Sequence, residues 1–247
     1  MRHFGLIGRE LGHSFSAKFF NGKFASEGIE ADYKLFEIEK IEDIHSLLAT
    51  TPLSGFNVTI PYKESIIPLL HELSTTAREV GAVNCVEIRD GKLIGHNTDA
   101  AGIQASLHWL DLAEGTKALV LGSGGASKAT QYILRKLGIE FKVVSRDSGR
   151  GDITYAELTP EIIAEHKLII NATPVGMFPN VESAPQLDYE SIGSDHKVFD
   201  LVYNPAQTEF LRRAKEQGAS TMGGMLMLQT QAIASWHIWQ GPKQEQN

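Results

Sequence analysis

The feature of this sequence most suggestive of chemistry is a cluster of glycines that follows an apolar run at Leu119–Leu121. The run predicts a short buried strand, and the residues after the cluster carry apolar side chains at helical spacing. Gly122 permits a sharp turn, and Gly124 allows a phosphate to approach backbone that carries no Cβ. A helix is predicted over Ser127–Leu137, and its N-terminal amides favour an anion. The spacing therefore predicts a dinucleotide-binding turn, with an ordinary structural turn as the alternative.

A basic loop after the next predicted strand, Phe141–Val144, indicates which dinucleotide the turn would take. The residue about 20 positions after the glycine turn meets the adenosine ribose in folds of this kind. Here Ser145 is followed by Arg146 and Arg150, and guanidinium groups hold a 2′-phosphate through forked, charge-assisted bonds. This arrangement favours NADP over NAD. The alternative is that both arginines are solvated loop charges, and the acidic Asp147 lies between them.

A further apolar run, Leu168–Ile170, leads into Asn171-Ala-Thr173. It predicts another buried strand, and the loop after it would run under the nicotinamide half of the cofactor. Thr173 is therefore a candidate cofactor contact.

Polar side chains stand at predicted strand ends and turns in the first hundred residues, namely Asn57, Lys63, Asn84 and Asp99. Ligands of open α/β sheets bind at strand ends, so these side chains are expected to converge on one cleft. Alternation along its strand places Thr59 on the same side as Asn57. A lysine beside an aspartate supplies both a proton and a positive charge. The alternatives are a surface lysine and, for Asp99, an N-cap of the next helix.

Two serines, Ser14 and Ser16, precede a predicted helix over residues 17–27. One interpretation is that Ser16 is the N-cap of this helix. The other is that two hydroxyl groups close to a helix N-terminus form a neutral cradle for a carboxylate.

The composition describes a globular chain and argues against several classes of partner. Of the 247 residues, 42% are hydrophobic, and the formal net charge is -7. That charge gives no long-range attraction for nucleic acid or anionic lipid, and no apolar run approaches a membrane span. Cys85 is the only cysteine, which excludes an intrachain disulfide and suits a reducing compartment. We expect a cytoplasmic protein, monomeric or homodimeric, that acts on a small molecule and holds no metal.

The assembled motifs resemble the shikimate dehydrogenase family along nearly the whole chain. The matching segments are His13-Ser-Phe-Ser16, Asn57-Val-Thr-Ile-Pro-Tyr-Lys63, Gly81-Ala-Val-Asn84, Gly95-His-Asn-Thr-Asp99, Gly122-Ser-Gly-Gly-Ala126, Asn171-Ala-Thr173, Asp200-Leu-Val-Tyr-Asn-Pro205, and Met227-Leu228 followed by Gln231. The resemblance implies reversible, NADP-linked reduction of 3-dehydroshikimate to shikimate in the pathway to aromatic amino acids.

The resemblance also implies an α/β fold of two domains. A substrate-binding domain would cover residues 1–100, and a Rossmann-type NADP-binding domain would cover residues 101–222. The C-terminal helix, residues 223–240, would return to the first domain, and the active site would lie in the cleft between the two.

Roles for individual residues follow from the same resemblance. It implies that Lys63 and Asp99 are the catalytic pair. It implies substrate contacts at Ser14, Ser16, Asn57, Thr59, Asn84, Tyr203 and Gln231. It implies cofactor contacts at Gly122, Gly124, Gly125, Ala126, Ser145, Arg146, Arg150 and Thr173.

The chain departs from the family pattern at a few positions. Ala17 stands where the family has proline, and Ala100 stands where it has glycine; both alter loop geometry. Asp147 and Pro174 replace a threonine and a serine and bear on cofactor affinity. Three other functions remain open: a quinate-accepting relative, another two-domain dehydrogenase such as one acting on a folate, and a non-catalytic NADP-binding sensor.

Overall fold

The computed structural model describes residues 1–12 and 14–241 of the chain. It divides into two compact units, the first comprising Met1–Thr98 with Ala232–Asn247 and the second Asp99–Gln231. The first residue of the motif His13-Ser-Phe-Ser16 and residues 242–247 lie outside the described residues.

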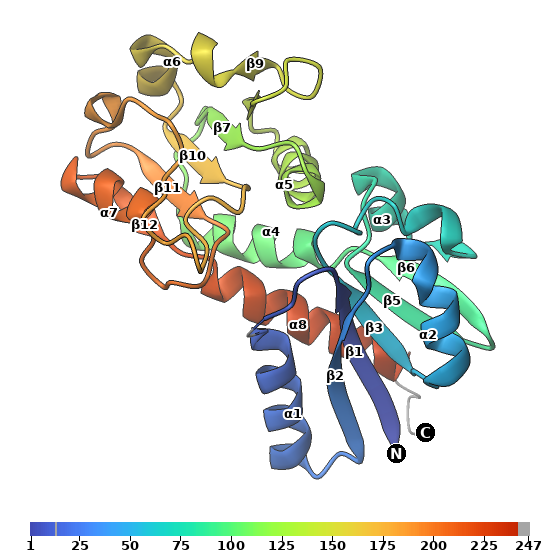
Figure 1. The fold of residues 1–247 in the computed structure, drawn as a ribbon. Helices are drawn as coiled ribbons and strands as arrows, with labels where there is room; N and C mark the ends of the chain where they lie inside the picture. The colour runs from blue at the N-terminus through green and yellow to red at the C-terminus, as the bar shows by residue number, and fades with distance from the viewer. Residues whose placement is uncertain (13, 242–247) are drawn as a thin grey trace. The chain divides into compact units, whose positions relative to one another are not determined.

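Unit 1 is built on a six-stranded mixed sheet with the order β2-β1-β3-β5-β6-β4 (Figure 1). Its strands are β1 (Arg2–Gly8), β2 (Ala31–Glu37), β3 (Gly55–Val58), β4 (Glu72–Leu73), β5 (Cys85–Arg89) and β6 (Lys92–His96). β1 is parallel to β2 and β3, whereas β5 is antiparallel to both β3 and β6. The carboxyl ends of β1, β3 and β6 therefore meet the amino end of β5 at one edge of the sheet.

The helices of unit 1 connect these strands. They are α1 (Phe15–Glu27), α2 (Ile44–Thr50), α3 (Thr75–Val80) and the short 3-10 turns η1 (Ile41–Asp43) and η2 (Ile67–Leu69). β5 and β6 form a hairpin, with Asp90 and Gly91 at φ angles of 52° and 74° in the turn. Positive φ at both central residues matches the twist of the two strands.

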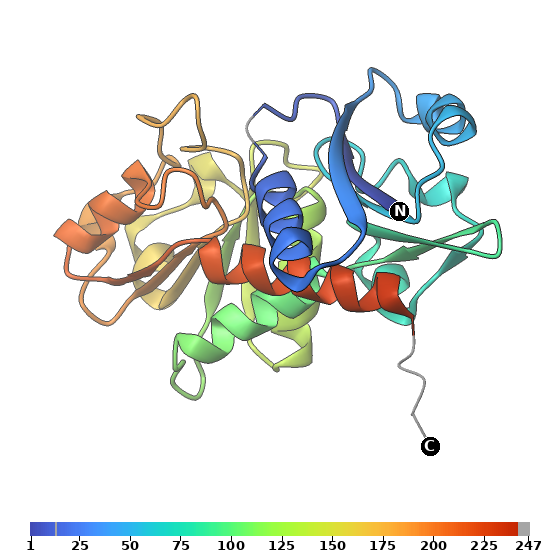
Figure 2. The same cartoon turned by 90° about the horizontal axis from the view of Figure 1, so that it is seen from below.

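The last helix, α8 (Met225–Gln240), contributes its C-terminal half to the core of unit 1. Trp236 and Trp239 pack against Phe24 and Phe20 of α1, with ring centroids 5.2 Å and 5.3 Å apart. Figure 2 shows α1 lying across α8. The Trp239 indole N–H donates to the carbonyl of Val86, 3.0 Å away, which satisfies the one polar atom of that side chain. The expected return of the C-terminal helix to the first domain is confirmed.

Unit 2 is a parallel sheet with the order β12-β11-β10-β7-β8-β9, as in a doubly wound fold. Its strands are β7 (Ala118–Leu121), β8 (Phe141–Ser145), β9 (Ile153–Thr154), β10 (Leu168–Asn171), β11 (Lys197–Asp200) and β12 (Ser220–Met222). Its remaining elements are α4 (Asp99–Trp109), α5 (Gly125–Lys136), α6 (Pro160–Glu165), α7 (Glu209–Glu216) and the 3-10 turns η3 (Tyr155–Glu157) and η4 (Tyr189–Ser191). Strand order reverses between β7 and β10, so ligands of such a sheet bind at the carboxyl ends of these two strands.

The predicted α/β fold of two domains is confirmed. The elements that the sequence analysis missed are short: β4, β9 and α6. Within the described part of the chain, no helix is long and apolar enough to cross a membrane, and no group of His, Cys, Asp and Glu side chains is arranged to hold a metal ion.

Candidate active site

The predicted site residues of unit 1 all lie at the edge where β1, β3 and β6 end. Ser14 and Ser16 come after β1, and Thr59 and Lys63 come after β3. Asn84 immediately precedes β5, which runs in the opposite direction. The topology of the sheet therefore brings together residues that are up to 70 positions apart in the sequence.

Ser14, and not Ser16, is the N-cap of α1, so the interpretation of Ser16 as the N-cap was wrong. Ser14 has extended backbone and its hydroxyl oxygen accepts from the Ser16 N–H, 3.2 Å away. The cap uses an oxygen lone pair and leaves the hydroxyl proton of Ser14 able to donate. Ser16 is buried on the first turn of the helix. The pKa of the neighbouring Tyr33 hydroxyl is raised well above its usual value because the residue is buried.

Asn57 is buried on β3, and its side-chain amide joins three elements. Its Nδ2 donates to the Asn84 carbonyl at 3.0 Å and to Ser235 Oγ at 2.9 Å. Its Oδ1 accepts from the Tyr33 hydroxyl at 2.8 Å. Both amide protons of Asn57 are therefore used inside unit 1, and the side chain acts here as a clamp between β2, β3 and α8.

Asn84 is held just as firmly, by Thr98. Its Nδ2 donates to Thr98 Oγ1 at 2.9 Å, and its Oδ1 accepts from the Thr98 N–H at 2.6 Å. Thr98 Oγ1 also lies 3.1 Å from Ser235 Oγ. The network fixes the backbone directly before Asp99, and neither Thr98 nor Ser235 carried a sequence signal for this role.

The predicted catalytic pair differs in exposure. Lys63 is half-buried, and its carbonyl accepts from the Val83 N–H at 2.7 Å, which ties the turn after β3 to the segment before β5. Asp99 is 3% exposed and is the first residue of α4. A carboxylate in the first turn of a helix is stabilised by the helix dipole.

In unit 2, the glycine cluster forms a turn between β7 and α5, as predicted. Gly122 has a φ of 106°, and a Cβ at this position would lie 2.8 Å from Thr173 Cγ2. At Gly124, in contrast, an added Cβ would meet no atom within 4 Å. Gly124 is the N-cap of α5 and supplies no side chain to the first N–H groups of the helix. The uncapped N–H groups and the open space beside them fit a phosphate of a dinucleotide.

The loop after β8 brings Arg150 next to this glycine turn. The Arg150 guanidinium lies 3.4 Å from the Ser123 carbonyl, and Ser123 Oγ lies 3.3 Å from Ser145 Oγ. Both Arg146 and Arg150 are exposed. Asp147 is exposed as well, and its Oδ1 accepts from the Gly149 N–H at 2.9 Å.

The segment after β10 is fixed by Asn171, a fully buried residue. Asn171 Nδ2 donates to Asp200 Oδ1 at 2.9 Å and to the Val175 carbonyl at 3.2 Å. Asn171 Oδ1 accepts from the N–H and the hydroxyl of Thr173, at 3.0 Å and 2.6 Å. These bonds place Thr173 beside Gly122.

Asp200 ends β11, and its carboxylate is fully buried. Besides Asn171, it accepts from the Val202 N–H at 2.9 Å and from the Thr208 hydroxyl at 2.6 Å. Burial raises the pKa of Asp200 to about 6, and the hydrogen bonds from Thr208, Val202 and Asn171 oppose that rise. The sequence analysis gave Asp200 no role of its own.

Two further predicted substrate contacts lie in unit 2. Tyr203 is half-buried in the segment after β11. Gln231 is buried on α8, and its Nε2 donates to the Leu228 carbonyl at 3.0 Å.

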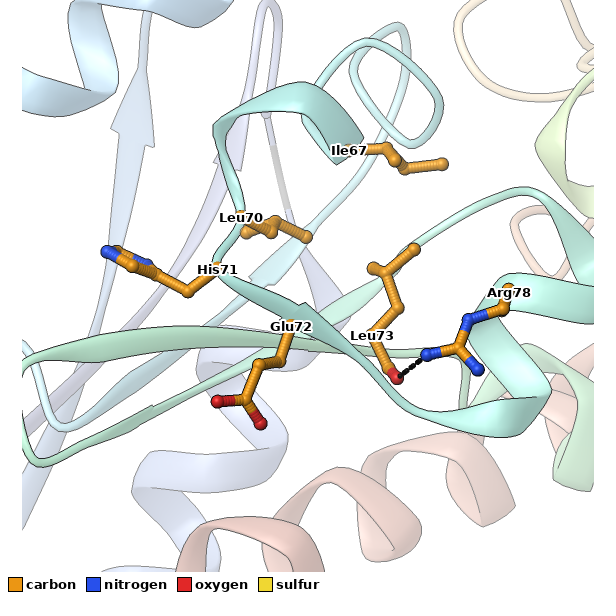
Figure 3. Close-up of a pocket in the computed structure, with 6 residues that line it drawn as sticks. All are labelled: Ile67, Leu70, His71, Glu72, Leu73 and Arg78. Atoms are coloured by element: carbon orange, nitrogen blue, oxygen red, sulfur yellow. Dashed lines mark hydrogen bonds between the residues drawn. The ribbon is translucent and has the colours of Figure 1, made fainter.

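A pocket of about 390 Å³ lies elsewhere in unit 1, beside β4 (Figure 3). It is lined by Ile67, Leu70, His71, Glu72, Leu73 and Arg78. The Arg78 guanidinium donates to the Leu73 carbonyl at 3.2 Å. The pocket contains no residue of the predicted site, and its few polar groups do not converge on one point.

Comparison with known proteins identifies the family. Residues 6–86 match the model of the shikimate dehydrogenase substrate binding domain. The chain is 38% identical over 251 residues to a shikimate dehydrogenase (NADP(+)) of Clostridium beijerinckii, covering 97% of this chain and 92% of that protein. The chain belongs to the shikimate dehydrogenase family.

Solved structures of related proteins agree with this assignment. A shikimate 5-dehydrogenase from Thermus thermophilus, in complex with NADP(H) and shikimate, is 32% identical with a TM-score of 0.87, covering 98% of this chain and 94% of that one. A quinate dehydrogenase from Corynebacterium glutamicum, in complex with NAD, is 27% identical with a TM-score of 0.85 and the same coverage. The fold of the family thus carries more than one substrate and cofactor.

Asp200 predicts a specific dependence of stability on pH. The pKa of this carboxyl group rises from 3.8 to about 6 on folding, because the folded protein favours the protonated form. Its contribution to the free energy of unfolding is therefore fully present at pH values below the unfolded pKa. That contribution is lost as the pH rises through about 6. Asp200→Asn stays neutral, so the unfolding free energy of the variant relative to wild type should increase between pH 4 and pH 7.5, by up to about 3 kcal/mol.

Urea denaturation at the two pH values measures this difference. The matched control is Glu114→Gln, at an exposed carboxylate of the same unit, which should show no comparable change. A difference between Asp200→Asn and wild type that is the same at both pH values would contradict the prediction.

Proposed function

We infer that this protein catalyses the reversible, NADPH-dependent reduction of 3-dehydroshikimate to shikimate, a step of aromatic amino acid biosynthesis. The observation that carries the inference is the near full-length identity with NADP-dependent shikimate dehydrogenases, in a chain that holds the family motifs at both sheet edges. Unit 1 binds the substrate and unit 2 binds NADP. The enzyme acts in the cytoplasm as a monomer or homodimer, and its partner is the small-molecule substrate.

The substrate binds at the edge of the unit 1 sheet. Ser14 and Ser16 take the carboxylate, and the free hydroxyl proton of Ser14 supports this role. The hydroxyl groups of the substrate ring are hydrogen-bonded or held in position by Asn57, Thr59, Asn84, Tyr203 and Gln231. The rigidity of Asn57 and Asn84, each held by several buried hydrogen bonds, keeps these groups preorganised.

Lys63 and Asp99 carry the proton chemistry. When bound, NADPH supplies the hydride to the substrate ketone. The ketone oxygen gains negative charge as it is reduced, and Lys63 provides a positive charge and a proton to that oxygen. Asp99, buried at the start of α4, balances the lysine charge. The backbone before it is fixed by the hydrogen bonds of Thr98 with Asn84.

NADP is held by the carboxyl edge of the unit 2 sheet. The pyrophosphate lies on the amides of Gly122, Gly124, Gly125 and Ala126, and Thr173 lies beside the nicotinamide half. Ser145, Arg146 and Arg150 bind the adenosine ribose and its 2′-phosphate. The hydrogen bond from the Gly149 N–H to Asp147 Oδ1 supports this assignment, because it engages one oxygen of the acid within its own loop.

A second candidate, oxidation of quinate with NAD, is favoured by the similarity to the Corynebacterium quinate dehydrogenase. Shikimate has no hydroxyl group on the carbon that bears the carboxylate, whereas quinate has one. An unpaired buried hydroxyl costs about 1–3 kcal/mol, so a pocket built on two serines should prefer shikimate by roughly tenfold to hundredfold.

The decisive assay compares kcat/KM for shikimate and quinate, each with NADP and with NAD. We expect shikimate with NADP to be the best pair. Comparable values for the two acids would favour the quinate function, and no turnover with any pair would favour a non-catalytic sensor.

The cofactor assignment predicts a selective effect at the basic loop. Replacing Arg146 or Arg150 by Ala should raise KM for NADP by a factor corresponding to about 1.5–3 kcal/mol, because a charge-assisted bond to the phosphate is lost. KM for NAD, which lacks that phosphate, is the internal control. Equal effects on the two cofactors would remove both arginines from the site.

If Lys63 and Asp99 are the catalytic pair, replacing either residue should lower kcat without unfolding the protein. Lys63→Ala should lower kcat by a factor on the order of 10² to 10⁴ with a smaller change in KM. Asp99→Asn keeps the size of the side chain and removes its charge. Lost activity at an unchanged Tm would support catalysis, whereas a lower Tm with retained activity would show that Asp99 serves only the start of α4.

A further inference from the structure

Asp200 is a buried ionised group that the proposed mechanism does not use. It lies at the end of β11, and its two carboxylate oxygens serve different parts of unit 2. Oδ1 accepts from Asn171 and from the Val202 N–H, whereas Oδ2 accepts from Thr208. Thr208 is the N-cap of α7, and its Oγ1 accepts from the Leu211 N–H at 3.3 Å. The carboxylate is thus hydrogen-bonded in two directions. Its bond to Asn171, here called the loop arm, leads to the segment after β10, and its bond to Thr208, here called the helix arm, leads to the start of α7.

The loop arm is a chain of hydrogen bonds whose direction is set by the carboxylate together with two backbone groups, the Val175 carbonyl and the Thr173 N–H. An ionised carboxylate only accepts, so the side of the Asn171 amide that faces Asp200 must be the NH₂ group. The oxygen of Asn171 then faces Thr173 and accepts from both its N–H and its hydroxyl. With the Val175 carbonyl taking the second amide proton, Asn171 has four hydrogen bonds and no unused donor.

This arrangement places the segment after β10 against the glycine turn. Asn171 pairs with Leu121 in the sheet, and the Ala172 N–H donates to the Leu121 carbonyl at 2.9 Å. Thr173 Cγ2 lies where a side chain at Gly122 would begin. The Thr173 hydroxyl donates to Asn171 and accepts from the Val175 N–H at 3.2 Å, so it fixes the shape of the loop.

We propose that Asp200 is a positioning residue for the dinucleotide: through Asn171 it holds residues 172–175 beside the glycine turn in the arrangement that binds NADP. The proposal rests on the proposed function, because it concerns the affinity of the same site. The fraction of molecules with the loop in place sets the apparent affinity. If the carboxylate at position 200 is lost, Asn171 Nδ2 keeps only the Val175 carbonyl as an acceptor, so the side chain that holds Thr173 is less firmly fixed.

The raised pKa of Asp200 supports a positioning role over a purely structural one. Burial makes the ionised carboxylate costly for the fold near neutral pH, as its pKa of about 6 indicates. An amide of the same size avoids that cost. Asp200→Asn should therefore fold at least as stably as wild type at pH 7.5 while binding the dinucleotide less tightly, a combination that a residue serving only stability would not give.

The test measures the dissociation constant of NADPH by fluorescence titration, without substrate, together with Tm. Asn171→Ala removes the loop arm and should raise the dissociation constant about tenfold or more. Asp200→Asn should raise it about threefold to tenfold with Tm unchanged or higher. Thr208→Val removes the helix arm of the same carboxylate, so it should lower Tm but keep the dissociation constant within about twofold of wild type.

Two results would overturn the proposal. One is an unchanged dissociation constant in Asp200→Asn, whether or not Asn171→Ala binds more weakly or fails to fold. The other is equal weakening of NADPH binding in Thr208→Val and Asn171→Ala. A wild-type protein that does not bind NADPH would overturn the proposed function and this proposal with it. Wild-type binding with unchanged variants would overturn the proposal alone.

Discussion

Buried side-chain amides must have their hydrogen bonds satisfied, and this constraint holds both ligand-binding edges of the protein in place. An amide left unpaired in the interior costs about 1–3 kcal/mol, so each buried asparagine has one strongly preferred orientation. Asn57 and Asn84 join the strand ends of unit 1, and Asn171 joins the strand ends of unit 2. In each case at least one hydrogen-bond partner of the amide lies on another element. The geometry of the loop is therefore set by how the strands are arranged in the sheet as well as by the sequence of the loop. Groups that are held in this way need little reorganisation when a ligand binds.

The fold and the general place of the site were predictable from the sequence because their signals are local. The run Leu119–Leu121 is buried on both faces of a parallel sheet and reads as an apolar strand. Gly122 was predictable for a similar reason, since a positive φ and a close neighbour leave little choice but glycine. Lys63 and Asp99 were recognisable as polar residues at strand ends. Their proposed roles depended on the family motif as well.

The parts that escaped prediction depend on partners distant in the sequence or on small local differences. Ser235 bonds to Asn57 across 178 positions, and nothing in the sequence around either residue indicates the pairing. The choice between Ser14 and Ser16 as the cap of α1 is a matter of a single 3.2 Å hydrogen bond. α6 has a capping threonine, Thr159, and a proline at its start, but only six residues, too few to show a helical period. Asp200 looked like an ordinary strand end because its burial and its three donors are tertiary features.

The structure also changes how Asp147 is interpreted. This acidic residue lies between two arginines that are proposed to bind phosphate, and its sequence position alone argues against NADP. A carboxylate directly at the end of β8 would accept from a ribose 2′-hydroxyl and repel a 2′-phosphate. Asp147 instead lies two residues past Ser145, and its Oδ1 accepts from the Gly149 N–H while its carbonyl accepts from the Arg150 N–H at 3.0 Å. An aspartate that bonds to backbone two residues on shapes a tight turn, and here the turn returns the chain toward the glycine cluster. The result is an Arg150 guanidinium within 3.4 Å of the Ser123 carbonyl. The acid therefore helps to bring an arginine next to the glycine cluster, so its negative charge is compatible with the proposed role of Arg150 in binding a 2′-phosphate.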